Sequence, residues 1–148
     1  MSTYTRFDSR TAKVNYSPEV VYNFATDIRN FRRFIPSGSF SDIDFRQDSC
    51  SFRADYLGTV SVQLSERVIY KKIVFSGNAM MQNDFSITLF LHETPERHSE
   101  IKLIFEAEMN PFLKMAASEP LRKFLDTMMD EIENFSGWAD INEYNQPL

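Results

Sequence analysis

The sequence is poor in the residue types that build metal, disulfide and phosphate-binding sites. Its single cysteine, Cys50, cannot form an internal disulfide, and His92 and His98 are too few to complete a Cys/His set for structural zinc. The four glycines lie about twenty or more residues apart, so neither a phosphate-binding loop nor a dinucleotide-binding motif can be assembled. We therefore expect no metal site and no cofactor.

Long hydrophobic runs and an excess of positive charge are also missing. No stretch approaches the roughly 20 apolar residues of a membrane-spanning helix, and the first ten residues contain no apolar signal core. The 16 Lys and Arg against 21 Asp and Glu give a net charge of -5. This field repels nucleic acid and anionic membranes, apart from any local basic patch. We expect a cytoplasmic protein with no nucleic-acid partner and no stable membrane insertion.

Aromatic and sulfur-containing side chains are abundant. The 148 residues contain 14 Phe, 6 Tyr, one Trp and 7 Met. Such side chains either fill a core or line an apolar pocket, and their number alone does not separate the two. The length suits a single domain spanning residues 1–148, with a core over residues 5–135 and a tail over residues 136–148.

The N-terminal part of the sequence predicts one strand followed by two short helices. Residues 5–16 are mostly polar, with apolar residues on one parity, which is typical of a half-exposed strand. Ser17-Pro18-Glu19 then supplies an N-cap, a proline at the first helical position and an acid in the first turn. A second short helix follows and ends before Pro36.

The rest of the chain predicts a sheet followed by a long helix. Between residues 40 and 110 the hydrophobic period is two, and the clearest strands are Phe85–Leu91 and Ile101–Met109, which form a hairpin. An apolar stripe over residues 121–135 then predicts an amphipathic helix, which Pro120 either begins or kinks. This order predicts an α+β domain in which a curved antiparallel sheet of about seven strands wraps a long C-terminal helix.

Two segments carry a resemblance to a known family: SPEVVYNFATD at residues 17–27, and NPFLKM at residues 110–115 before the final helix. With the order of elements, they resemble the START-like (SRPBCC) superfamily, whose fold is called helix-grip. Within it, the chain looks most like small bacterial proteins grouped with polyketide cyclases, dehydrases and lipid-transport proteins. The resemblance covers about residues 5–135. It implies an apolar cavity between the sheet and the C-terminal helix, and it carries over no catalytic residue.

The predicted ligand-binding residues are those that combine inward strand parity, or the apolar stripe of the helix, with this implied cavity. They are Phe52, Tyr56, Val62, Tyr70, Phe75, Phe85, Ile87, Leu103, Phe105, Met109, Phe124, Leu125 and Met128. The two tyrosines stand out because a buried phenol needs a polar partner. A filled core is the alternative, since an empty pocket of about 300 Å³ would cost about 7 kcal/mol.

Other polar candidates have a plainer interpretation. Glu66 shares the inward parity of its strand, but a bulge or a strand end would turn it outward. Both histidines fall on expected surface positions, and Cys50 lacks a neighbouring base for nucleophilic chemistry. Three arginines at positions 29, 32 and 33 lie beside Phe31 and Phe34, a cluster typical of a solvated helix face or, alternatively, of an anionic contact.

The tail keeps Trp138, Ile141 and Tyr144 after the helix ends, which indicates docking on the domain or, equally, a frayed end. Phe90 and Ile104 share an outward patch that the tail, or a second copy of the chain in a homodimer, would cover. We interpret the sequence as that of a protein that binds or transports a small hydrophobic or amphipathic molecule without covalent chemistry. A cyclase- or dehydrase-type enzyme, and an interaction module acting on a chaperone or membrane complex, are the alternatives.

Overall fold

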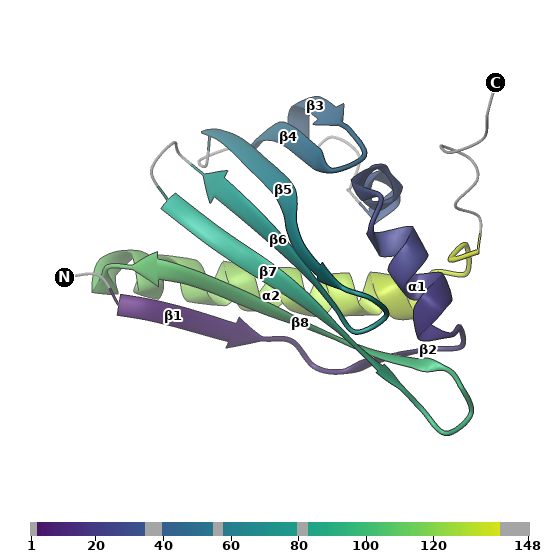
Figure 1. Ribbon diagram of the computed structural model, residues 1–148. Coiled ribbons are helices and arrows are strands. Elements are labelled where there is room, and N and C mark those ends of the chain that lie inside the picture. Colours follow the sequence, from purple (N-terminus) through teal and green to yellow (C-terminus); the bar gives the residue numbers. More distant parts are fainter. Residues whose placement is uncertain (1–2, 35–39, 55–57, 80–82, 140–148) are drawn as a thin grey trace.

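The computed structural model describes residues 3–34, 40–54, 58–79 and 83–139, which form a sheet and a long helix lying across one of its faces (Figure 1). The strands run antiparallel in the order β1-β8-β7-β6-β5-β4-β3, and β2 also pairs with β8. The strands are β1 Thr3–Asp8, β2 Ala12–Val14, β3 Phe40–Phe45, β4 Ser49–Ala54, β5 Gly58–Val68, β6 Lys72–Ala79, β7 Asn83–Glu93 and β8 Ser99–Met109. The helices are α1 Pro18–Ala25, the 3-10 helix η1 Ile28–Phe34 and α2 Pro111–Asn134.

The predicted α+β architecture is confirmed, with eight strands in the sheet. The additional strand arises because the N-terminal segment is interrupted at Ser9, so that β1 and β2 pair with β8 separately. The Ser9 hydroxyl accepts a hydrogen bond from the Leu103 amide at 2.9 Å, and the Ser9 amide donates to the Leu103 carbonyl at 2.9 Å. These bonds satisfy the backbone of β8 where the first strand breaks.

Both helix starts follow from local sequence. The Ser17 hydroxyl accepts from the Val20 amide at 3.3 Å, and the Asn110 side chain accepts from the Leu113 amide at 2.7 Å. Each cap satisfies an amide that has no partner within its helix. Helix α2 begins at Pro111 and continues through Pro120, so that proline does not begin the helix.

The core lies where α2 packs against β1, β2 and β8. The predicted hairpin is confirmed, and its register places Phe85 opposite Ala107 and Leu89 opposite Leu103. From α2, the buried side chains are Leu125, Met129 and Ile132. Each large apolar side chain contributes about 1.5–3 kcal/mol when it is fully buried, so this half of the sheet holds the helix.

The tail docks through Trp138, whose side chain is 1% exposed. Its ring lies 4.9 Å from that of Phe24, 6.3 Å from that of Phe34 and 5.2 Å from that of Phe135, measured between centroids. Trp138 therefore packs on α1 and η1. It does not cover the outward patch around Phe90. Residues 141 and 144 lie outside the described residues.

Within the described ranges, no helix combines the length and the apolar composition needed to cross a membrane. The same residues contain no group of three or more His, Cys, Asp or Glu side chains placed to hold a metal ion.

Candidate functional site

The inward face of the sheet is closed at one side and accessible at the other. Near α2, the inward side chains Leu89 and Leu103 are buried. Toward the far edge, Val60 on β5 is buried, but five other inward apolar side chains of β3, β4 and β5 are only half-buried: Phe45, Cys50, Phe52, Val62 and Leu64. Because α2 packs mainly on β1, β2 and β8, the concave face keeps accessible apolar surface on the side of β3–β5.

Helix α2 presents a matching apolar flank. Ala117, Leu121, Phe124 and Met128 are spaced four, three and four residues apart, which puts them on one side of the helix. Phe124 is 44% exposed, and the other three are half-buried. This flank lies beside the fully buried stripe that includes Leu125. The sheet and the helix together therefore offer unfilled apolar surface, which a ligand can bury.

The structure divides the predicted lining residues into core residues and accessible residues. Five of them are buried in the core: Phe75, Leu103, Phe105, Met109 and Leu125. Those that keep accessible surface on an inward strand position or on α2 are Phe52, Val62, Phe85, Ile87, Phe124 and Met128. Tyr56 lies outside the described residues. The accessible set is therefore the candidate binding surface.

The prediction that Tyr70 lies on the inward strand face is wrong. The pairing of β5 with β6 shifts between Leu64 and Glu66, so a bulge ends the inward phase. Tyr70 then lies in the turn after β5 with φ 61°, and its ring meets that of Tyr22 edge-on at 5.4 Å. The same bulge places Glu66 beside Val74 on the outer face, where its carboxylate pairs with Lys72 Nζ at 3.6 Å. It is not poised for acid–base work inside the fold.

Cys50 is the one titratable side chain among these accessible inward residues. Burial, together with the negative charge of Asp44, raises the pKa of the Cys50 thiol to about 11. The thiol is therefore protonated at neutral pH and behaves as a small apolar group.

A glycine shapes the floor of the inward face. Gly77 on β6 lies opposite Phe85 on β7, and a Cβ atom built on Gly77 would lie 2.2 Å from Cζ of Phe85. The Phe85 ring also stacks on that of Phe105, with centroids 5.4 Å apart and an interplanar angle of 18°. Gly77 thus leaves the space in which the Phe85 ring lies against the sheet.

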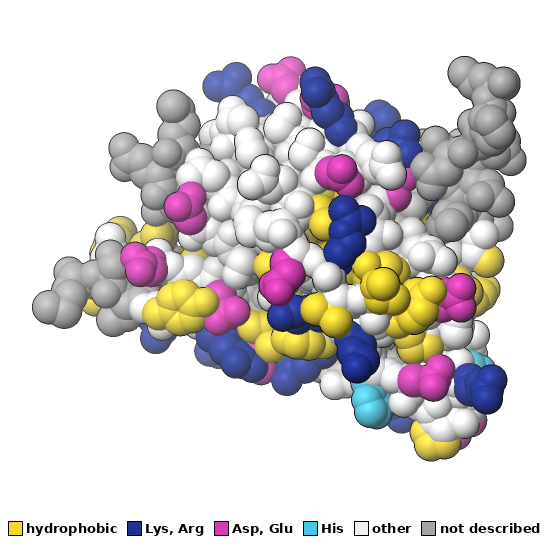
Figure 2. All heavy atoms as spheres, viewed as in Figure 1, with side chains coloured by type: hydrophobic (Ala, Val, Ile, Leu, Met, Phe, Trp, Pro, Cys, Tyr) yellow, Lys and Arg dark blue, Asp and Glu magenta, His cyan; other side chains and the backbone are white. Residues whose placement is uncertain are grey.

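The outer face of the sheet carries a hollow, which the sequence analysis did not predict. This open groove has a volume of about 1060 Å³. Register places Ser51, Ser61 and Asn78 in one row, and Gln63, Ser76 and Ser86 in the next. These short polar side chains form a neutral floor, and Figure 2 shows this upper part of the face as mostly neutral polar surface. The signal in the sequence was the Ser, Asn and Gln residues at the outward positions of β4–β7.

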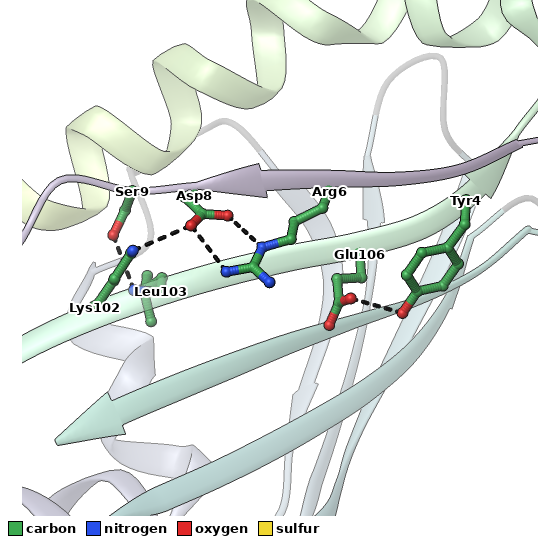
Figure 3. Close-up of polar contacts among 7 residues, drawn as sticks. All are labelled: Tyr4, Arg6, Asp8, Ser9, Lys102, Leu103 and Glu106. Carbon is green, nitrogen blue, oxygen red and sulfur yellow. Dashed lines mark hydrogen bonds and ion pairs between the residues drawn. The ribbon is translucent and has the colours of Figure 1, made fainter.

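One end of this outer groove is bordered by Tyr4, Glu106 and Glu108. Beyond the groove, polar contacts continue along β1 and β8 to Arg6, Asp8 and Lys102 (Figure 3). The Tyr4 hydroxyl donates to the Glu106 carboxylate at 2.8 Å. Arg6 Nε donates to Asp8 Oδ1 at 2.7 Å, and Lys102 Nζ lies 3.1 Å from Asp8 Oδ2. These cations, Arg6 foremost, lower the pKa of the Asp8 carboxyl to about 2. Within these contacts, the phenol and the charged groups of β1 and β8 thus satisfy one another.

The side chains of the arginine and phenylalanine cluster at residues 29–34 interact mainly with other residues of the domain. Arg29 Nη2 pairs with the buried Asp27 carboxylate at 2.6 Å. The Arg33 guanidinium lies over the ring of Phe24 at 5.9 Å, and Phe34 is buried. The cluster therefore fixes η1 against the core and does not present a row of unengaged cations.

Comparison with solved structures identifies the fold. The Mll3558 protein from Rhizobium loti has a TM-score of 0.63 at 17% identity, over 88% of this chain and 99% of its own. A norcoclaurine synthase mutant from Thalictrum flavum, in complex with a transition-state analogue, has a TM-score of 0.71 at 12% identity, over 99% of both chains. No protein-family model and no curated protein sequence matches the chain. These structures are 17% identical or less, so they show the fold, which is helix-grip.

Proposed function

We propose that the protein binds or carries a small hydrophobic or amphipathic molecule, such as a lipid or a polyketide, between its sheet and α2, without covalent chemistry. One observation carries this proposal: most inward apolar side chains of β3–β5 and the flank of α2 keep accessible surface. Burying such surface against an apolar ligand releases about 25 cal/mol per Å². A ligand thus completes a core that the chain leaves partly open.

An enzyme of cyclase or dehydrase type is the second candidate, because a synthase is among the structural neighbours. Such a reaction needs a group that moves a proton at the bound molecule. Among the accessible inward residues that the structure describes, only Cys50 titrates, and its pKa of about 11 keeps it neutral. Glu66 and Tyr70 point elsewhere. Binding without covalent chemistry requires no proton-transferring group, so it agrees better with the described surface.

The test combines native mass spectrometry of the purified protein with displacement of a fluorescent apolar dye, anilinonaphthalene sulfonate, by palmitate and by an aromatic polyketide. Val62→Trp places a large ring on the inward face of β5, and Gln63→Trp places the same ring on the outer face. We expect Val62→Trp to weaken dye binding at least tenfold and Gln63→Trp to leave it unchanged. The absence of any co-purified molecule, together with no saturable dye binding, would contradict the proposal.

A further inference from the structure

A patch of apolar and basic side chains lies at the end of the sheet where β5 turns into β6. Register puts Val68 opposite Lys72, Lys72 opposite Phe90, and Phe90 opposite Lys102, so these four form one row on the outer face. The turn adds Ile69, which is 66% exposed. We call this surface the basic–apolar patch, made of Val68, Ile69, Lys71, Lys72, Phe90 and Lys102.

The turn at the centre of this patch is held in place. The Lys71 amide donates to the Val68 carbonyl at 3.0 Å, and the Leu91 amide donates to the Lys71 carbonyl at 2.8 Å. Tyr70 turns its ring back onto that of Tyr22 in α1. The chain therefore presents Ile69 to solvent at a fixed position, where a large aliphatic side chain gains nothing from the fold.

The charges around these apolar residues are predominantly positive. Three lysines belong to the patch. Glu66 and Asp8 beside it are engaged in ion pairs, and Glu100 lies one row further along, opposite His92. Glu66 pairs with Lys72, and Asp8 is shared between Lys102 and Arg6. Figure 2 shows hydrophobic and basic side chains, with acidic ones among them, over the lower part of this face. The patch is thus a local positive surface on a chain whose net charge is -5.

The positive charges and exposed apolar side chains of the patch indicate the class of partner that it binds. A second copy of the chain docking through the same surface would bring like charges together, which opposes association. An anionic phospholipid surface offers negative headgroups for the lysines and an apolar layer for Ile69, Val68 and Phe90. We propose that this patch docks the protein reversibly on anionic phospholipid membranes. Because the docking requires no ligand on the concave face, it is tested independently of the proposed function.

Vesicle co-sedimentation of the full chain tests the proposal. The probes are vesicles of phosphatidylcholine alone and of phosphatidylcholine with 30% phosphatidylglycerol. We expect binding to the anionic vesicles only, with release when sodium chloride is raised from 0.1 to 0.5 M, because salt screens the lysines. Ile69→Asp should lower the partition coefficient at least tenfold, and Lys71→Glu with Lys72→Glu should do the same.

Matched controls come from the start of α2, which Figure 1 places at the far end of the sheet. Phe112 is 80% exposed and lies next to the exposed Lys114. Phe112→Asp and Lys114→Glu should leave vesicle binding within twofold of the unaltered chain, and thermal melting confirms that every variant is folded. Three results would overturn the proposal: no binding to anionic vesicles at low salt, loss of binding in the α2 variants alone, or a dimer in solution that Ile69→Asp dissociates.

Discussion

Removing the ring of Trp138 should destabilise the whole domain, although the residue lies beyond the last helix. Its side chain is 1% exposed and contacts three phenylalanine rings that belong to α1, η1 and the end of α2. Truncating a buried aromatic side chain to alanine costs about 3–5 kcal/mol. For a chain of this length, each kcal/mol lowers Tm by about 3 °C. We therefore expect Trp138→Ala to lower Tm by about 10 °C or more.

The assay is urea unfolding followed by circular dichroism, with Trp138→Phe as the control. That variant keeps an aromatic ring in the cluster and removes an indole N–H that has no hydrogen-bond partner, so it should lose far less stability. Trp138 is the one tryptophan of the chain, and its fluorescence in the unaltered protein should be blue-shifted and resistant to iodide. A loss below about 1 kcal/mol in Trp138→Ala, or ready quenching by iodide, would refute the docking of the tail.

Two further predictions concern the sheet. Gly77→Ala should lower the free energy of unfolding by about 1–3 kcal/mol, because the new methyl group collides with the Phe85 ring; adding Phe85→Leu should restore part of it, and an unchanged urea midpoint for Gly77→Ala would contradict the close approach. Because Arg6 and Lys102 lower the pKa of Asp8 to about 2, its carboxylate stabilises the fold above about pH 4, and this contribution is lost as pH falls toward 2. Asp8→Asn should therefore show a smaller loss of stability between pH 4 and pH 2, and equal acid sensitivity would argue against it.

The sequence predicts what depends on local periodicity. The hairpin of β7 and β8, and the Ser17 cap of α1, are confirmed because each follows from residues near one another in the chain. Tyr70 was misplaced because one bulge reverses the parity of everything after it. A bulge inserts a single residue and leaves no hydrophobic signal of its own. The strand break at Ser9 was missed for a similar reason, since its bonds are made to Leu103 across the sheet.

The accessible half of the concave face was even less predictable, because inward parity says which face a residue lies on and not how deeply it is covered. Val62 and Leu103 share inward parity, yet only Leu103 is fully buried. The difference arises from where the helix lies, and a tertiary contact of that kind has no periodic trace. Parity therefore indicated the inward face for residues such as Val62 and Leu103, and it did not show which part of that face stays accessible.

The contacts that hold α2 explain which part of the concave face stays accessible. Its C-terminal half is tied to the N-terminal strands: Arg10 pairs with Asp130 at 2.6 Å and with Glu133 at 2.8 Å, and the Lys13 amide donates to Glu133 at 3.0 Å. The Tyr16 hydroxyl adds a bond to the Ser136 carbonyl at 2.9 Å. A single exposed ion pair contributes little to stability, but the pairs of Arg10 lie beside the buried Met129 and Ile132. Toward its start, the same helix exposes Phe112 and Met115 and buries no residue before Leu125. A molecule that binds under α2 is therefore easiest to admit beneath this N-terminal half, because that half has the fewest contacts to break.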